Sequence, residues 1–389
     1  MSIELSPQQA KAQKAFRAFV DDSVVPYADQ YDQEERTPPE LIQKLAANGY
    51  LGSIIPKAFG GQENDMVTHG LLCEEIGRGS ASLLSLLTVH GMVSQALFKW
   101  GTPEQKAHWL PRLATGDVVG AFGLSEPDVG SDANNVKMSA KTETDGYVLN
   151  GKKRWISFGQ IAQGALVFAQ FEGKPTAFLV ETDRPGFSVK PIRGMLGFRS
   201  AMLAELQLEA CRIPQENRVG PLGFGFSHVA SSALDHGRFC IAWGAVGLGQ
   251  ACLEACLRYT SERQQFGEYL RRYQLIQAMI AEMITNIKAA RLLCYQAGRL
   301  KDQGDYESIM ETSIAKYFAS KMVNRVASDA VQIHGANGCS SEYPIQRYLR
   351  DARIMEIIEG STQMQQLIIA HYGYQMLNRL YPTRIESPA

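Results

Sequence analysis

A single carboxylate near the C-terminus lies where an acid or a base could act. Glu359 follows the apolar pair Ile357–Ile358 and precedes Gly360 in the segment 354–363 (IMEIIEGSTQ). Apolar neighbours would remove water from the carboxylate and raise its pKa towards neutrality, as a general base requires. A lone Glu before a Gly is more often a solvated loop residue, so composition alone favours that simpler interpretation.

Two further segments gather polar groups that could bind a flat or anionic ligand. Residues 122–132 (FGLSEPDVGSD) end an apolar run and turn through Gly130, with hydroxyl and backbone N–H groups close together. Residues 332–338 (QIHGANG) end an expected helix in a glycine-rich loop. A plain Pro-Gly turn would explain the first segment more simply than a binding site.

Other local patterns carry less weight. Residues 146–153 (GYVLNGKK) nearly match a phosphate-binding loop, but Lys153 stands where a Ser or Thr must reach magnesium. The glycines at 244, 247 and 249 have the spacing G-x-x-G-x-G, the reverse of the dinucleotide-binding motif G-x-G-x-x-G. They also lie in a helical pattern, so a role in close helix packing is favoured over dinucleotide binding. The seven histidines include no H-E-x-x-H motif and no pair at i, i+4, and the seven cysteines include no C-x-x-C pair. No metal site and no disulfide framework is therefore predicted.

Changes in the period of the apolar residues predict how the chain is divided. Helical spacing runs from residue 6 to about 116. From 121 to about 219 the period is two, which predicts strands, with turns expected at Asp145–Gly146 and Asn150–Gly151. Long amphipathic helices return from about residue 226. Because no helix is expected between strands, the β region is predicted to be antiparallel.

These periods predict an α+β fold built from three domains. We expect an N-terminal α-helical domain at 1–118, a middle antiparallel β domain at 119–224, and a C-terminal, four-helix-bundle-like α domain at 225–389. A chain of 389 residues is long enough to bury several such cores.

Charge and composition narrow the classes of partner. The chain has 39 Lys and Arg against 40 Asp and Glu, so no polyanion-binding face and no nucleic-acid partner is expected. The best apolar run, 239–248, is shorter than the ~18 residues that cross a bilayer. Residues 1–20 mix charged and apolar positions, unlike a signal peptide. With its scattered cysteines, the protein is predicted to be cytoplasmic, with no membrane partner.

Taken together, five segments resemble those of one family. They are AFGLSEPDVGSD at 121–132, NGKKRWIS at 150–157, ERQQFG at 262–267, QIHGANG at 332–338, and EYPIQRYLRDARIMEIIEGSTQ at 342–363. In order and spacing, over nearly the whole chain, they are similar to those of the acyl-CoA dehydrogenases, flavoproteins with α, β and α domains in this order. The resemblance implies FAD as the cofactor and α,β-dehydrogenation of an acyl thioester as the reaction.

The resemblance also assigns residues to FAD and to the substrate. In the β domain, the expected flavin contacts are Phe122, Leu124, Ser125, Gly130, Ser131, Trp155, Ile156 and Ser157. In the C-terminal domain they are Arg263, Phe266, Gln274, Gln332, Gly335, Ala336, Ser361 and Gln363. The residues from Arg263 to Ala336 are expected to bind the FAD of a neighbouring subunit. The expected substrate contacts are Ser131, Asp235, Arg238 and Gly360.

Glu359 matches the catalytic base of the family, which takes the α proton while the flavin accepts the β hydride. Some branches carry the base at a position that matches Gly237, which has no side chain to accept a proton. Many relatives have an aromatic residue at the position of Ile358, so the shape of the acyl pocket is expected to differ here. By the same resemblance, we expect a homotetramer that passes electrons to an electron-transferring flavoprotein.

Three other interpretations remain open. The acyl group could be tethered to an acyl-carrier protein, since residues 358–361 (IEGS) resemble biosynthetic relatives. Oxygen could be the electron acceptor. The chain could also be a catalytically silent scaffold of the same fold, although intact Glu359, Arg263 and Trp155 argue against silence.

Overall fold

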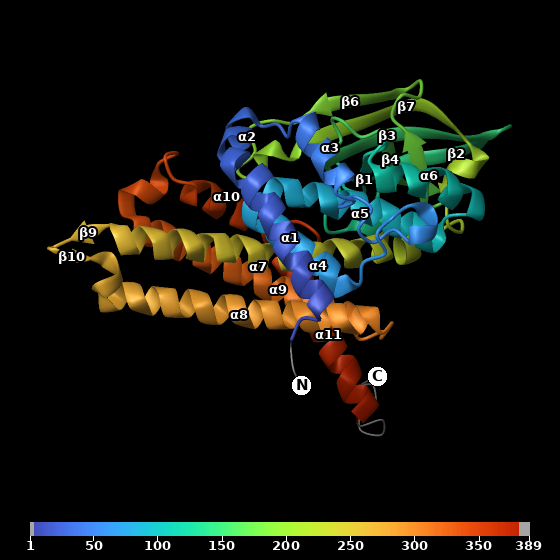
Figure 1. Ribbon diagram of the computed structural model, residues 1–389. Coiled ribbons are helices and arrows are strands. Elements are labelled where there is room, and N and C mark those ends of the chain that lie inside the picture. Colours follow the sequence, from blue (N-terminus) through green and yellow to red (C-terminus); the bar gives the residue numbers. More distant parts are fainter. Residues whose placement is uncertain (1–3, 381–389) are drawn as a thin grey trace.

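The computed structural model describes residues 4–380, in which the chain passes from helices to a sheet and back to helices (Figure 1). The predicted α+β architecture, with a helical region on each side of a β region, is confirmed. The first helical region contains α1 (Pro7–Ser23), α2 (Ala28–Glu34), α3 (Pro39–Ala47), α4 (Met66–Gly79), α5 (Ala81–Trp100) and α6 (Pro103–Thr115).

Local sequence signals set where the helices of this region begin. At α1, the Ser6 side chain accepts a hydrogen bond from the Gln9 N–H, and the Gln9 side chain accepts one from the Ser6 N–H. The same capping box occurs at α6 between Thr102 and Gln105, with Pro103 at the first helical position. Both arrangements satisfy N–H groups that a helix start leaves without partners.

The β region forms one large sheet. The large sheet contains β1 (Gly120–Gly123), β2 (Ser139–Glu143), β3 (Gly146–Ile156), β4 (Gly164–Phe171), β5 (Lys174–Glu181), β6 (Phe187–Pro191), β7 (Ala204–Pro214) and β8 (Arg218–Val219). The strands lie in the order β6-β7-β3-β2-β4-β5-β8, with β1 paired to β4.

The sheet is mixed, whereas the sequence predicted an antiparallel one. β1 runs parallel to β4, and β2 meets β4 in a short parallel contact at Ser139 and Gln170. The remaining pairs are antiparallel. Hairpin signals report only strands that follow one another, so they could not show that β1 pairs with a strand beyond the β2–β3 hairpin.

The turn expected at Asn150–Gly151 is also wrong, because β3 continues through it. Gly151 has φ 145°, and the register with β7 shifts between Leu149 and Gly151, which marks a β-bulge. A Cβ atom at Gly151 would lie 2.8 Å from the Cα of Met138, so the bulge requires glycine there. The turn predicted at Asp145–Gly146 does join β2 to β3.

Strand β4 is buried on both faces, which explains its uninterrupted apolar sequence. Leu166 and Phe168 pack on the side of the sheet that faces α5 and α6. Ala165, Val167 and Ala169 belong to a second apolar cluster on the other side. A central strand with two covered faces needs apolar residues at every position.

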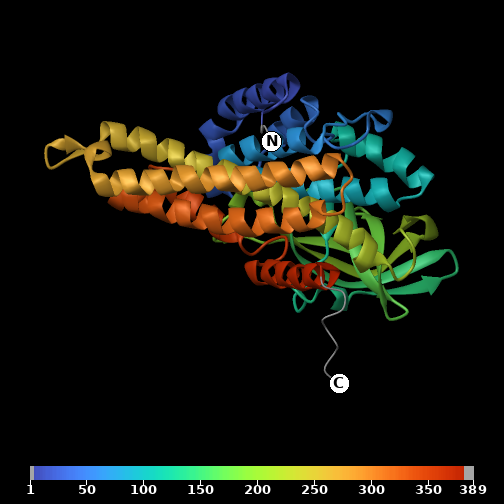
Figure 2. The same cartoon turned by 90° about the horizontal axis from the view of Figure 1, so that it is seen from below.

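The second helical region contains three long helices and two shorter ones: α7 (Ser231–Glu262), α8 (Gln274–Asp302), α9 (Ser308–His334), α10 (Ile345–Met355) and α11 (Thr362–Leu380). Figures 1 and 2 show α7, α8 and α9 running side by side, with the α7–α8 connection projecting away from the sheet. That connection contains the small hairpin of β9 (Gln264–Gln265) and β10 (Glu268–Tyr269).

Helix α5 lies between the helical bundle and the sheet, since it packs on both α7 and β1. It and the continuous helical stretch Gly225–Glu262 are long and apolar enough to cross a bilayer, but both are mostly buried within the protein. Burial in a core accounts for such a composition.

Helices α4 and α7 approach each other closely at glycines. A Cβ atom at Gly77 would lie 2.6 Å from the Cα of Gly244, and one at Gly247 would lie 2.8 Å from the backbone N of Arg78. The glycines at 244 and 247 therefore allow helix packing, as their pattern in the sequence indicated.

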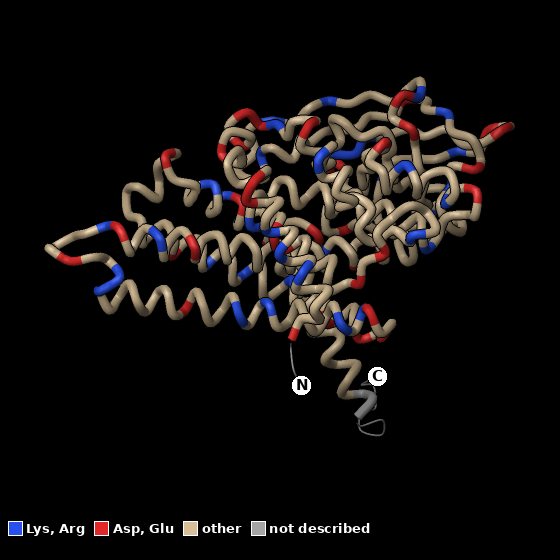
Figure 3. The backbone as a smooth tube through the Cα atoms, viewed as in Figure 1, with Lys and Arg blue, Asp and Glu red and all other residues tan. Residues whose placement is uncertain are grey.

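Ion pairs connect segments that are far apart in the sequence. Arg347 and Arg350 of α10 reach Asp29 and Asp32 of α2, at 2.8 and 2.6 Å. The numbers of positive and negative side chains nearly balance, and Figure 3 shows both signs interspersed along the chain.

Candidate active site

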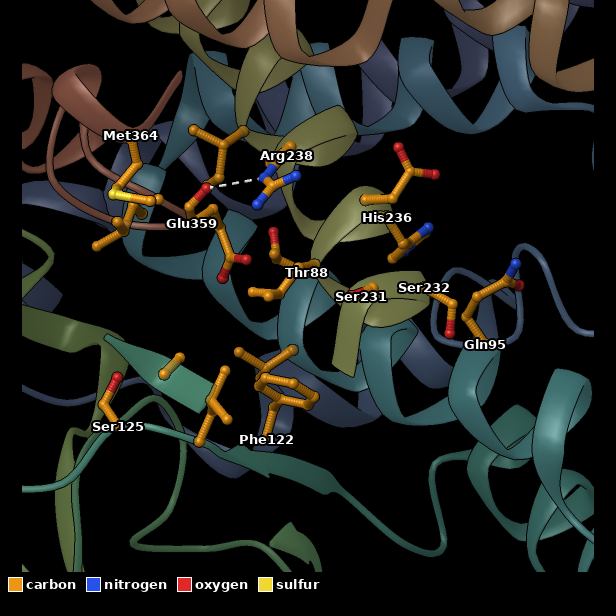
Figure 4. Close-up of a pocket in the computed structure, with 18 of the residues that line it drawn as sticks. Thr88, Gln95, Phe122, Ser125, Ser231, Ser232, His236, Arg238, Glu359 and Met364 are labelled. Carbon is orange, nitrogen blue, oxygen red and sulfur yellow. Dashed lines mark hydrogen bonds between the residues drawn. The ribbon is translucent and has the colours of Figure 1, made fainter. Parts of the chain in front are cut away.

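A cavity of about 1340 Å³ lies between the sheet and the helices. Its walls come from α5 and α7, from the loop after β1, from the end of β3, and from the loop between α10 and α11. Figure 4 shows Glu359, Arg238 and Thr88 near its centre, with Phe122 and Ser125 across from them. Several elements that are distant in sequence thus meet at one space.

Glu359 lies in the loop that joins α10 to α11, with φ 54°. Its Oε2 atom is buried, and no group among residues 4–380 is hydrogen-bonded to it. Desolvation raises the pKa of Glu359 to about 7, although the positive charges of Arg238 and Lys316 act in the opposite direction. A carboxylate that titrates near neutrality and lacks a fixed partner can take a proton from a bound molecule.

Three side chains hold the loop around this carboxylate. Arg238 Nε donates to the backbone O of Glu359 at 3.4 Å, and Gln365 Nε2 donates to the same oxygen at 3.2 Å. Lys316 Nζ donates to the backbone O of Gly360 at 2.7 Å. Lys316 is fully buried on α9, and desolvation lowers its pKa to about 8.

The sequence analysis did not identify Lys316, because a single lysine within a helix belongs to no motif. Its position was nevertheless informative. Lys316 lies on the same inward face of α9 as Ala315 and Ala319, where an unpaired charge would be costly. A lysine among the apolar positions of an amphipathic helix was the available signal.

The first turns of α7 supply the other polar groups near Glu359. Asp235 and Arg238 both line the cavity, and Asp235 forms an ion pair with Lys301. Gly237 lies between them in sequence, and its missing side chain leaves room for the carboxylate of Glu359.

A buried ion pair supports the loop that follows β1. Lys153 Nζ lies 2.7 Å from Glu126 Oε1 and donates to the backbone O of Leu124 at 3.2 Å. The carboxylate of Glu126 also accepts the N–H groups of Lys137 and Met138, at 2.6 and 2.9 Å. Lys153, the last residue of the near-match to a phosphate-binding loop, is thus buried in a structural contact.

The residues on the sheet side of the cavity fit a flat, polar, aromatic ligand. Trp155 is 46% exposed with φ 66°, and it lines the cavity. The hydroxyl-bearing residues Ser125, Ser131 and Ser157 line the same cavity. An exposed indole face with hydroxyl groups around it suits the isoalloxazine ring of a flavin, which is flat and rich in nitrogen and oxygen.

The structure brings most of the predicted site residues to this one cavity. Those that line it are Phe122, Leu124, Ser125, Gly130, Ser131, Trp155, Ile156, Ser157, Asp235, Arg238, Glu359, Gly360 and Ser361. Gln363 is exposed on the first turn of α11 and does not line it.

The other predicted cofactor residues lie at the far end of the helical bundle. They are Arg263, Phe266, Gln274, Gln332, Gly335 and Ala336, and all are exposed. Tyr259 of α7 joins the two segments that carry them, since its ring stacks on His334 at 4.2 Å and its OH accepts from Asn337 Nδ2 at 3.0 Å. Within one chain, this group is therefore separate from the cavity.

Family models match three consecutive segments of the chain. The acyl-CoA dehydrogenase N-terminal domain matches residues 6–117, the middle domain matches 121–211, and the C-terminal domain matches 223–373. The chain belongs to the acyl-CoA dehydrogenase family. The predicted acyl-CoA dehydrogenase fold, its FAD dependence and the flavoenzyme class are thereby confirmed.

Similar proteins cover almost the whole chain. The probable acyl-CoA dehydrogenase YngJ of Bacillus subtilis is 37% identical over 95% of this chain and 99% of its own. The butyryl-CoA dehydrogenase of Megasphaera elsdenii has a TM-score of 0.93 and 32% identity, over 96% of this chain and 100% of its own. The prolyl acyl-carrier-protein oxidase AnaB has a TM-score of 0.90 and 29% identity, over 95% of this chain and 99% of its own.

Proposed function

We propose that Glu359 removes the α proton of a saturated acyl thioester during its α,β-dehydrogenation. The observation that carries the proposal is a buried, unpartnered Oε2 atom on the cavity wall, with a pKa raised to about 7. At neutral pH a large fraction of such a group is deprotonated, yet it is basic enough to accept a proton from carbon. Ile357 and Ile358 line the cavity beside it, and Ile358 packs against the apolar core.

The same loop offers a donor for the negative charge that develops on the thioester oxygen. The N–H of Glu359 donates to no group among residues 4–380, so it is available to that oxygen. Lys316 and Arg238 fix the loop through the carbonyl groups of Gly360 and Glu359, and so they hold both the base and the donor in place. FAD, when bound against Trp155, supplies the acceptor for the β hydride.

The remaining assignments follow the lining of the cavity. We propose that Phe122, Leu124, Ser125, Gly130, Ser131, Trp155, Ile156, Ser157 and Ser361 contact the flavin and that Ser131, Asp235, Arg238 and Gly360 contact the substrate. The exposed group at the far end of the bundle would bind FAD of another subunit, which supports the proposed homotetramer, and Gln363 is a further proposed flavin contact. An electron-transferring flavoprotein is the proposed electron acceptor, with oxygen as the alternative.

A carrier-protein substrate is a second candidate. The similarity to the prolyl acyl-carrier-protein oxidase AnaB favours it, since that protein shares the fold over nearly its whole length. The chemistry at Glu359 would be unchanged, and only the group that carries the thioester would differ.

Anaerobic reduction of the bound flavin tests the function and separates these candidates. The purified protein is mixed with a panel of saturated acyl-CoA thioesters and with the same acyl groups on a carrier protein. We expect either the acyl-CoA thioesters or the carrier-protein thioesters to bleach the flavin of the parent protein. The same thioesters should not bleach the flavin of Glu359→Gln. A flavin-containing protein that no saturated thioester reduces would overturn the proposed reaction, and a purified protein without flavin would favour the silent scaffold.

A further inference from the structure

A second cluster of reactive side chains lies in the core between α4 and α7. His69 and Cys73 are four residues apart on α4, and His236 and Cys240 are four residues apart on α7. A spacing of four places each His and Cys on one helix face. All four side chains are buried. The pattern H-x-x-x-C thus occurs once on each of two helices that pack together.

The ligand atoms of this cluster converge. Sγ of Cys73 and Sγ of Cys240 lie 3.6 and 3.4 Å from Nε2 of His69, and the three atoms all lie within 4.8 Å of one another. His236 flanks them, with Nε2 at 3.4 Å from Sγ of Cys240 and its ring stacked on that of His69 at 5.1 Å.

These separations match those of a tetrahedral thiolate and imidazole site. Zn–S bonds of about 2.3 Å and Zn–N bonds of about 2.1 Å at the tetrahedral angle place S and N about 3.6 Å apart. The two sulfur–nitrogen distances at His69 differ from this value by a few tenths of an ångström or less. A metal ion bound by Nε2 of His69 and either sulfur would therefore require little change in these two distances.

Two features outside the three ligands favour a built site. Nδ1 of His69 lies 3.0 Å from Oγ of Ser53, so that nitrogen has a partner, and with its proton there the lone pair of Nε2 faces the thiols. The glycine contacts between α4 and α7 hold the two helices close together. His236 also lines the large cavity, so the cluster lies directly behind the wall of that cavity.

We propose that His69, Cys73 and Cys240, with His236 beside them, bind a thiophilic transition-metal ion of the Zn²⁺ type. Both thiols lose their protons to solvent on binding, and no redox step is involved. The ion links α4 to α7 and lies behind the wall that carries Gly237. Its role is structural, because all the ligands are buried.

A cobalt titration of the full-length, FAD-containing protein tests the site. After treatment with a chelator and a thiol reductant, Co²⁺ is added, and absorption is followed at wavelengths longer than those of the flavin. We expect one tetrahedral, thiolate-bound Co²⁺ per chain, displaced by Zn²⁺, and a Zn²⁺-dependent rise in Tm. Cys73→Ser and Cys240→Ser should each weaken metal binding at least tenfold. The matched control is Cys294→Ser, a buried cysteine of α8 outside the cluster, which should bind as the parent does.

The parent protein provides a measurement that does not depend on folding of the variants. X-ray absorption of the Zn²⁺-loaded protein should show two sulfur ligands at about 2.3 Å. A zinc ion bound through nitrogen and oxygen alone would overturn the proposal. So would the absence of thiolate-bound Co²⁺ in the parent, or bands unchanged in both cysteine variants.

Discussion

Gly237 on α7 and Glu359 in the α10–α11 loop face each other directly. A Cβ atom built at Gly237 would lie 2.7 Å from Cδ of Glu359, so the carboxylate occupies the space that a side chain at 237 would need. Two positions that are far apart in the sequence therefore direct their side chains to the same point of the cavity. The cavity has room for a carboxylate from one of them at a time.

This relationship predicts that the base can be moved. Glu359→Gly should abolish flavin reduction, because no carboxylate then reaches the α carbon. Gly237→Glu in the Glu359→Gly background should recover part of it, because the new carboxylate enters the vacated space from α7. Stopped-flow reduction of the flavin measures both variants. A double variant as inactive as the single one, with FAD and substrate bound, would contradict the shared position.

Glu359→Gln should retain FAD and lose at least about 100-fold in the rate of flavin reduction, since an amide cannot accept the α proton. Glu356→Gln is the matched control: Glu356 lies three residues earlier, at the end of α10, and forms an ion pair with Arg353. Pre-steady-state kinetics with the best thioester of the panel checks both. Near-parental reduction by Glu359→Gln would remove Glu359 from the role of base.

The pH dependence should report the pKa of Glu359. The carboxylate is the active form, so kcat/KM should fall as the pH drops through about 7. Lys316 lowers this pKa by its positive charge, so Lys316→Met should move the acidic limb of the profile to higher pH. Lys321→Met, which removes an exposed lysine of the same helix, should leave the limb in place. An unshifted limb in Lys316→Met would show that its charge does not act on Glu359.

The Lys153–Glu126 pair should contribute strongly to stability. Glu126→Gln leaves a buried lysine and two backbone N–H groups with a weaker partner, and we expect a loss of about 3–5 kcal/mol in the free energy of unfolding. Denaturant unfolding is measured for Glu126→Gln, for Lys153→Met and for the double variant Glu126→Gln/Lys153→Met. The difference between the loss in the double variant and the sum of the two single losses gives the coupling energy of the pair. The exposed pair Arg212–Glu143 is the control, and Glu143→Gln should cost far less. Additive losses at Lys153 and Glu126 would argue against a coupled pair.

The sequence by itself determined the division into helical and β regions, because the period of apolar residues reports which face of each element is buried. Residue types alone favoured a solvated Glu359, and the resemblance of its segment to the family assigned it as the base. Most residues assigned by resemblance line one cavity, because their motifs lie in loops at the ends of strands and helices that pack together.

Only the tertiary structure decided which distant residues meet. Lys316 reaches the loop of Glu359 from another helix, and the parallel β1–β4 pair joins strands separated by a hairpin. The His69–Cys73 and His236–Cys240 pairs are each unremarkable in sequence, and they form a cluster only because α4 and α7 pack at their glycines. Local patterns record what each segment buries, whereas the partner across the interface depends on how the whole chain packs.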